Sequence, residues 1–352
     1  MTTAQAPGSP ARRHVVAGVA VAVLLAVVLL LWAKWWPYAQ RVVTLAGSHT
    51  WTGSNVLGAG GVLPGDPPSW RAATSFTTAY LASVWQALVA ALLISAAVQA
   101  LVPRTWLLRV LDRPGRVRSA AAGGLLSTPS MMCTCCSAPV VVTLRRQGVP
   151  VSAAVAWWLG NPLLNPAVLV FLALVAPWQW TTTRLVVGIA VVVGGAALVG
   201  WIAERRRVTE VTPPADEPDD GRSTVRRFLV ALSRLSIVLV PEYLVVVLLI
   251  GAFRGWLFPL GAASAGVLAV VVAAVVGTLL VLPTAGEIPV LQGLALAGAT
   301  AGPVGALLVT LPAVSIPGIV MVGRAVGWRA TAATTGIVVL GGLAGAALLT
   351  LL

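Results

Sequence analysis

The sequence predicts an all-α polytopic membrane protein with inverted repeats, two re-entrant hairpins and broken helices. Hydrophobic residues make up 58% of the 352-residue chain and charged residues only 9%, whereas a soluble domain carries about 25% charged residues. Apolar runs long enough to cross a bilayer alternate with clusters of arginine. Prolines and glycines recur about 150 positions apart, which indicates an internal repeat.

The net charge of +13 comes almost entirely from arginine, since Lys34 is the only lysine. The arginines gather at the ends of apolar runs, as cytoplasmic loop residues do under the positive-inside rule. The charge therefore predicts a multi-pass membrane protein and no nucleic-acid partner. We expect the protein in the plasma membrane (the bacterial inner membrane). No GxxxxGK[ST] motif occurs, which argues against ATP-driven transport by this chain alone.

Residues 1–75 are expected to form one N-terminal membrane helix followed by an extracytoplasmic loop. The apolar run 14–31 is longer than the apolar core of a signal peptide, which has about 7–15 residues. It ends in an aromatic belt of Trp32, Trp35 and Trp36. Residues 37–75 are rich in Gly, Pro, Ser and Thr, a composition typical of a loop.

Residues 76–207 are expected to form the first repeat. A membrane span is followed by an interfacial amphipathic segment, a re-entrant hairpin, a broken helix and a second span. These elements are expected at residues 76–102, 104–118, 119–144, 151–178 and 185–203.

The hairpin prediction rests on arm length and flanking charge. Thr128-Pro129-Ser130 interrupts the apolar stretch 119–144, and arginines flank both of its ends. Each arm of about a dozen residues spans about 18 Å, whereas the hydrocarbon core is about 30 Å thick. Neither arm can cross, so we expect both ends at the cytoplasm and the tip near the middle of the membrane.

Residues 208–225 are expected to be a cytoplasmic linker, because the acidic, proline-rich stretch PPADEPDDGR interrupts the apolar sequence. Residues 226–352 are expected to form the second repeat with the same order of elements. Spans are expected at residues 228–250 and 331–352, apolar sequence at 256–282, an interruption at 283–287 and a broken helix at 302–322.

The two repeats share landmark residues, and arginine placement predicts that they are inverted. A shift of 150 positions aligns four pairs: Pro139 with Pro289, Gly148 with Gly298, Pro162 with Pro312, and Asn165 with Ser315. By the positive-inside rule, span 76–102 runs inward and span 228–250 runs outward. Inverted repeats of this kind place a substrate site near the midplane, where discontinuous helices meet.

All three cysteines lie in MMCTCCSAP, as Cys133, Cys135 and Cys136. Free cysteine is a common small buried residue, but three at a predicted helix break exceed what packing requires. A disulfide within so short a segment is strained. A structural zinc site needs four ligands, and the two histidines lie far along the chain. The remaining interpretation is a clamp of two or three thiolates for a soft, thiophilic species. We expect Cys133 and Cys135 to be the primary, metal-binding ligands and Cys136 to support them.

Five polar residues are further candidates for the transport path. Asn161, Asn165 and Ser315 lie where prolines free backbone carbonyls, so they are expected to line a polar substrate path, although a tolerated proline kink explains them equally well. Charged groups inside a membrane usually face a cavity or a partner. Glu287 and Glu242 are therefore expected to carry protons, although Glu242 could instead form an ion pair with Arg234, eight residues earlier.

At MMCTCCSAP, GNPLLNPA and PTAGEIP, the sequence resembles the predicted-permease family that includes the organoarsenical efflux permeases (ArsP-type). Cys133-Thr134-Cys135 leading to Pro139 resembles the family's Cys-x-Cys and proline, and residues 162–166 resemble its Pro-x-x-Asn-Pro. The resemblance implies a membrane exporter of trivalent, thiol-reactive organoarsenicals with the cysteines as ligands. Cys136 is an additional thiol beyond the family's Cys-x-Cys, and the second hairpin carries Glu287 and no cysteine.

We therefore expect a secondary-active permease, not an enzyme, that exports a thiophilic substrate such as a trivalent organoarsenical or a soft metal species. The expected partners are the lipid bilayer, the small substrate and protons. No cofactor is expected, and the sequence leaves open whether the protein forms a homo-oligomer. The alternative is a membrane-embedded thiol oxidoreductase or metal-handling module that uses Cys135 and Cys136 in exchange chemistry.

Overall fold

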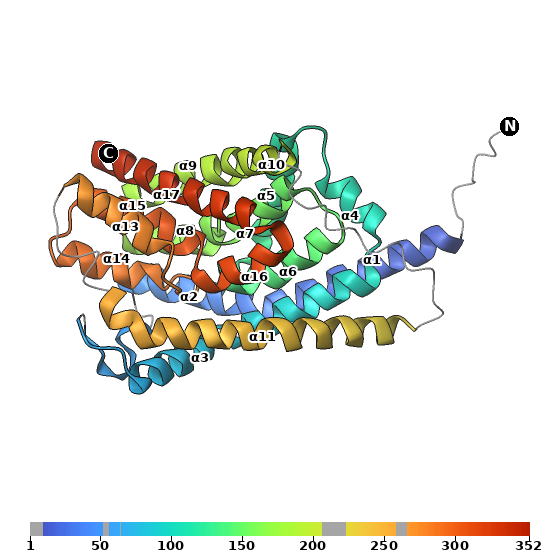
Figure 1. Cartoon of the computed structure of the whole chain (residues 1–352), viewed down its shortest axis with the longest axis horizontal. Helices are drawn as coiled ribbons and strands as arrows, with labels where there is room; N and C mark the ends of the chain where they lie inside the picture. The colour runs from blue at the N-terminus through green and yellow to red at the C-terminus, as the bar shows by residue number, and fades with distance from the viewer. Residues whose placement is uncertain (1–9, 52–55, 64, 206–222, 258–265) are drawn as a thin grey trace.

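The computed structural model describes residues 10–51, 56–63, 65–205, 223–257 and 266–352, which contain helices and no strand (Figure 1). Among these residues, six helices are long and apolar enough to cross a membrane, and a bent pair makes up to seven spans. The predicted all-α polytopic fold is confirmed. The α-helices are α1 (Pro10–Leu30), α2 (Trp36–Ser48), α3 (Trp70–Leu101), α4 (Arg104–Leu111), α5 (Arg116–Ser127), α6 (Thr134–Arg146), α7 (Val151–Leu163), α8 (Pro166–Val175), α9 (Trp178–Ile189), α10 (Ala196–Arg205), α11 (Thr224–Leu257), α13 (Val267–Gly277), α14 (Glu287–Leu296), α15 (Ala301–Ala313), α16 (Ile316–Val326) and α17 (Trp328–Leu351).

The first span runs through α1, the π-helical turn Leu31–Trp35 and α2, and it is longer than the sequence predicted. It covers Val15–Ser48, beyond the expected end at residue 31. Pro37 does not end the helix because a π-helical turn directly precedes it, and such local adjustments let membrane helices tolerate proline. The expected loop 37–75 is therefore wrong at both ends, since α2 reaches Ser48 and α3 begins at Trp70.

The long helices α3 and α11 lie side by side and run in opposite directions (Figure 1). At one end, Arg254 Nη1 donates to the carbonyl oxygen of Ala72 at 3.0 Å. Farther along, the rings of Tyr80 and Tyr243 lie 6.2 Å apart. Position numbers therefore fall along α11 as they rise along α3. An inverted repeat requires these opposite directions, but the inversion of the whole repeat stays a prediction.

Each half of the chain contains two helices separated by a break where the sequence predicts a hairpin. The first break, residues 128–133, lies between α5 and α6, and the second break, residues 278–286, lies between α13 and α14. Met131 and Ala285, one in each break, have φ values of 50° and 68°, a conformation uncommon for residues with a side chain. The interruptions are confirmed, whereas the re-entrant course of these helices stays a prediction.

Both predicted broken helices are present as the pairs α7–α8 and α15–α16. The α15–α16 pair bends by 52° at its break. Asn165 caps α8 through its side chain, and Ser315 is the residue before α16. Pro166 and Pro317 follow in the first turns of these helices, where proline is tolerated. The predicted pairing of Asn165 with Ser315 therefore marks equivalent positions in the two halves.

The internal repeat is visible in the boundaries of the helices. Gly148 and Gly298 follow α6 and α14 with φ values of 82° and 88°, and each N–H bonds to the carbonyl three residues earlier. The next helices, α7 and α15, begin at positions 151 and 301, and α9 and α17 begin at 178 and 328. Each pair is 150 positions apart, so the spacing of landmark residues reports a repeat of structure.

Two connecting segments complete the chain. The predicted interfacial segment 104–118 contains α4, whose Leu107 and Leu111 are buried, and the start of α5. The expected linker 208–225 lies outside the described residues up to position 222, and α11 already begins at Thr224. The domain boundaries otherwise stay a prediction.

Candidate functional site

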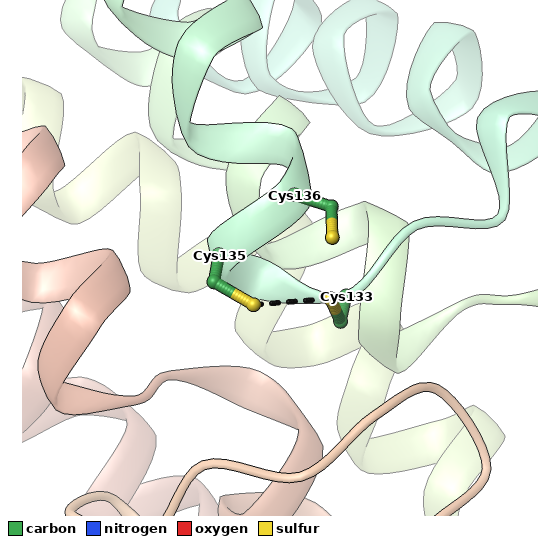
Figure 2. A group of neighbouring side chains, drawn as sticks. All are labelled: Cys133, Cys135 and Cys136. Carbon is green, nitrogen blue, oxygen red and sulfur yellow. Dashed lines mark hydrogen bonds between the residues drawn. The ribbon is translucent and has the colours of Figure 1, made fainter. Parts of the chain in front are cut away.

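Figure 2 shows Cys133, Cys135 and Cys136 gathered at the start of α6. Cys133 is the residue before the helix, and the other two lie in its first turn. Their Sγ atoms all lie within 4.8 Å of one another, and those of Cys133 and Cys135 are 3.1 Å apart. All three are free thiols and are at most 5% exposed. The first break therefore presents a compact, buried group of three sulfur atoms.

Side chains from α7 hold the first break in position. The Asn161 carboxamide oxygen accepts hydrogen bonds from the Ser130 hydroxyl and the Met132 N–H. Trp158 Nε1 donates to the Thr134 carbonyl oxygen at 3.1 Å, which anchors the first turn of α6. These bonds satisfy backbone and side-chain groups that the interruption of the helix would otherwise leave unpaired, and they orient the cysteine segment.

Two tyrosines contact the cysteine group from the paired helices α3 and α11. The Tyr80 hydroxyl lies 3.1 Å from Cys135 Sγ, and the Tyr243 hydroxyl donates to the same sulfur over 3.9 Å. Both tyrosine side chains are fully buried. Elements from both halves of the chain therefore meet at Cys135.

The second break faces the cysteines with a buried ion pair. Glu287, the first residue of α14, accepts a hydrogen bond from Arg184 Nη1 at 2.8 Å, and both side chains are at most 3% exposed. Arg184 also donates to the carbonyl oxygen of Pro162 at 2.7 Å. That carbonyl has no helical partner because the residue four positions later is Pro166, which has no N–H. Arg184 thus stabilises the break of α7–α8 and holds Glu287 in one contact network.

A cavity of about 10 Å³ lies between these groups, close to the space that one water molecule needs. Its lining combines the first break, the second break and both broken helices, and it includes Cys133, Thr134, Pro162, Arg184, Thr284, Glu287, Pro312 and Ser315. The cavity is too small for an organic substrate. The cavity as it stands has room for about one water molecule.

The candidate path residues divide into two groups. Ser315 lines the cavity, and its hydroxyl lies 3.0 Å from that of Thr134, joining α16 to α6. Asn161 and Asn165 are fully buried but do not line the cavity. Asn161 braces the first break, and Asn165 accepts from the N–H groups of Ala167 and Val168. Both asparagines therefore contact structural partners beside the cavity.

Glu242 lies at a different place from Glu287. It helps to line a second cavity of about 110 Å³ between α6, α11 and α16, together with Arg145, Arg146 and Arg324. Its carboxylate pairs with Arg324 at 3.2 Å. The alternative pairing with Arg234 is not found, because eight helical residues separate the two Cα atoms by about 12 Å along the helix axis. By the positive-inside rule, these arginines predict a cytoplasmic location for the cavity.

The donor set of the first break suits soft, thiophilic species. Thiolates prefer soft metal ions, whereas carboxylates and carbonyls suit hard cations. Among the described residues, the three cysteines form the one group of three or more His, Cys, Asp or Glu side chains close enough to share an ion. A structural zinc site usually has four protein ligands, so this group better fits a guest that binds to two or three sulfur atoms.

A family model described as predicted permease matches residues 69–350. The chain belongs to this permease family. It is also 40% identical over 323 residues to the UPF0718 protein YraQ of Escherichia coli, and the match covers 91% of each chain. No solved structure matches the permease. The family resemblance of the sequence motifs is confirmed. The permease is a multi-pass membrane protein, and its similarity to a bacterial protein is consistent with the bacterial inner membrane.

Sequence reasoning missed Arg184 and Lys34. Arg184 stands immediately before a long apolar run and outside the elements that the sequence predicts. An arginine that follows three threonines inside a membrane segment nevertheless indicates a buried partner or a functional site. Lys34 lies between tryptophans and reads as a belt residue, but its side chain is only 5% exposed. Its position in a π-helical turn is typical of functional sites, yet cannot be read from the sequence.

Proposed function

We propose that this permease is a secondary-active transporter that exports a thiophilic substrate, such as a trivalent organoarsenical or a soft metal species. The observation that carries the proposal is the group of three buried thiols at the first break, beside the cavity shared by both halves. Membership of the permease family supports transport as the activity. The substrate class follows from the affinity of thiolates for soft centres.

Cys133 and Cys135 act as the primary ligands of the metal or metalloid, and Cys136 supports them. Cys133 lines the closed cavity and lies against Cys135, so a guest that enters beside Cys133 can reach both sulfur atoms. Ligation requires thiolates and therefore releases thiol protons. Substrate binding and proton movement are linked through the ligands themselves.

Glu287 and Glu242 carry the coupled protons. Glu287 lines the same cavity as Cys133, so it can accept a proton there when its contact with Arg184 opens. Glu242 lies in the larger cavity at the arginine-rich side, where a proton can exchange with the cytoplasm. Ser315 lines the substrate path, and Asn161 and Asn165 orient its walls.

Transport requires the closed site to open alternately to each side. The bond between the Thr134 and Ser315 hydroxyls joins α6 of the first half to α16 of the second half, so one half must move against the other to separate them. Inverted repeats supply two equivalent arrangements related by such a movement. The antiparallel course of α3 and α11 and the 150-position repeat support this arrangement.

Accumulation of thiophilic compounds in inside-out vesicles tests the proposal. Wild-type protein is expected to accumulate at least one member of a panel of trivalent organoarsenicals and soft metal ions, driven by a proton gradient. Cys133→Ser, Cys135→Ser and Glu287→Gln are expected to abolish this accumulation. Ser137→Ala is the matched control, because Ser137 is buried one position after Cys136 in the same helix but is not in the cavity lining. Wild-type accumulation by both cysteine variants for every compound would refute the thiolate clamp.

A second candidate is a membrane-embedded thiol oxidoreductase or metal-handling module that uses Cys135 and Cys136 in exchange chemistry. It is favoured by the mutual proximity of the three thiols, whose Sγ atoms all lie within 4.8 Å of one another. In the redox case, a dithiol loses two electrons and two protons to an acceptor that a partner protein must supply. Alkylation of vesicles from either side separates the two functions. Thiols that react from alternate sides, depending on substrate, support transport, whereas constant one-sided reactivity without substrate flux supports redox chemistry.

A further inference from the structure

Lys34, the only lysine of the chain, points into the core from the π-helical turn of the first span. Its ammonium donates to the Tyr38 hydroxyl at 3.0 Å and to the Thr284 hydroxyl in the second break at 3.2 Å. Thr284 lines the same small cavity as Cys133. Lys34 is therefore one hydrogen bond away from the lining of the candidate site.

The neighbouring residue, Trp35, contacts the first break. Its indole N–H donates to the Pro129 carbonyl oxygen at 2.7 Å. Two consecutive residues of one π-helical turn thus bind the two opposite breaks, which belong to different halves of the protein. This arrangement holds the Lys34 ammonium at a defined place beside the cysteine group.

The Lys34 charge is buried without a carboxylate partner. Its side chain is 5% exposed. The ion pairs of the described residues join Glu287, Glu242 and Glu204 to arginines, and none of these pairs includes Lys34. The polar groups that it contacts are the hydroxyls of Tyr38 and Thr284. Hydroxyl groups solvate an ammonium but do not neutralise it, and a buried charge without a counter-charge is costly. The ammonium therefore has no carboxylate counter-charge among the described residues, and it lies one hydrogen bond from the cavity that Cys133 lines.

We propose that Lys34 is a specificity-determining residue that makes the cysteine site prefer substrates whose thiolate complex is an anion. This inference rests on the proposed thiolate clamp and names the class of its guest: monovalent soft cations held by two cysteines. Two thiolates around a monovalent cation carry one net negative charge, which the ammonium offsets. A complex without net charge leaves Lys34 uncompensated.

Two probes that use the same two thiols differ in the charge of their product. Silver ion reacts as Ag⁺ + 2 RSH → [Ag(SR)₂]⁻ + 2 H⁺, so two S–H bonds break, two S–Ag bonds form and an anion results. Phenylarsine oxide reacts as PhAsO + 2 RSH → PhAs(SR)₂ + H₂O, so the oxide oxygen leaves as water and the product is neutral. Neither reaction changes an oxidation state. Comparing the two affinities therefore isolates the effect of the Lys34 charge from that of the sulfur ligands.

The experiment measures both affinities by titration calorimetry on the purified full-length chain in nanodiscs and chloride-free buffer. Lys34→Met is expected to lower the affinity for Ag⁺ at least tenfold more than the affinity for phenylarsine oxide, a difference of about 1.4 kcal/mol. Lys34→Arg keeps the charge and is expected to retain the wild-type ratio of affinities. Cys133→Ser is expected to weaken both probes, because it removes a ligand common to them.

The outcomes separate the charge proposal from the thiolate clamp. If Lys34→Met lowers the affinity for both probes equally, or for neither, the proposed role of Lys34 is overturned. The cysteine variants test the thiolate clamp separately, so the clamp can still stand in that case. Unchanged binding of both probes in Cys133→Ser and Cys135→Ser would instead overturn the clamp. If Lys34→Met does not yield folded protein, Thr284→Val serves as a second variant, since it removes the hydroxyl that holds the ammonium. It is expected to shift the ratio in the same direction by a smaller factor, and an unchanged ratio would count against the proposal.

Discussion

Removing the carboxylate of Glu287 is expected to destabilise the permease more than any change at an exposed ion pair. Glu287→Gln leaves the Arg184 guanidinium buried without a counter-charge, with both native side chains at most 3% exposed and 2.8 Å apart. Breaking a buried pair from one side typically costs about 3–5 kcal/mol. We expect the apparent free energy of unfolding to fall by about 3 kcal/mol or more, because an amide oxygen replaces only part of the lost interaction.

Reversible unfolding in mixed micelles, followed by tryptophan fluorescence, measures this free energy. The exposed pair of Arg116 and Glu204 is the matched control, with a separation of 2.6 Å and exposures of 42% and 55%. Arg116→Gln is expected to cost less than about 1 kcal/mol, because solvent screens exposed pairs. The double variant Arg184→Met/Glu287→Leu should recover part of the loss but not all, because the Pro162 carbonyl then lacks its donor, at about 1–3 kcal/mol. Equal costs for Glu287→Gln and Arg116→Gln would refute a buried ion pair at the second break.

Three further predictions concern packing and the contacts between the halves. Gly345→Ala should destabilise the protein by about 1–3 kcal/mol, because the new methyl group meets the Gly305 carbonyl oxygen at 2.6 Å. Gly336→Ala in the same helix meets nothing within 4 Å and should stabilise the protein by about 0.5–1 kcal/mol. The same unfolding assay measures both variants, and equal effects on the free energy of unfolding would contradict this packing. A double-mutant cycle of Thr134→Val and Ser315→Ala should give a coupling energy of about 0.5–1.5 kcal/mol, and strictly additive costs would contradict the contact between the halves. Trp35→Phe should speed maleimide labelling of the cysteines, because the first break loses its contact with the first span, and wild-type labelling rates would show that this contact does not restrain the break.

The spans and their interruptions could be predicted because they depend on local properties of the chain. A long apolar run needs lipid or a protein core around it, and a proline removes one backbone donor wherever it stands. The breaks at Pro129 and between α7 and α8 follow from these two facts. The sequence does not reveal that the first span continues through Pro37, because a proline can either end a helix or be accommodated in one, depending on its position.

The sulfur ligands of the candidate site could also be found from the sequence, because all three cysteines lie within four positions. The charged groups of the candidate site could not be found in this way. Arg184 meets Glu287 across 103 positions, and Lys34 meets Thr284 across 250. Pairs so far apart become visible only when packing brings their helices together. The pairing of Glu242 with Arg324 instead of Arg234 has the same cause.

The sequence by itself determined that this is a membrane protein, that landmark residues repeat at a spacing of about 150 positions and that a group of thiols lies at a helix break. Hydropathy, proline position and cysteine spacing act along the chain, so they can be read from it. Only the tertiary structure decided which charges are buried, which of them form ion pairs, and that Lys34, buried without a carboxylate partner in the part of the chain that the structure describes, lies one hydrogen bond from the cavity that Cys133 lines. Electrostatic interactions depend on distance through space and on the exclusion of water, and both are properties of the packed molecule.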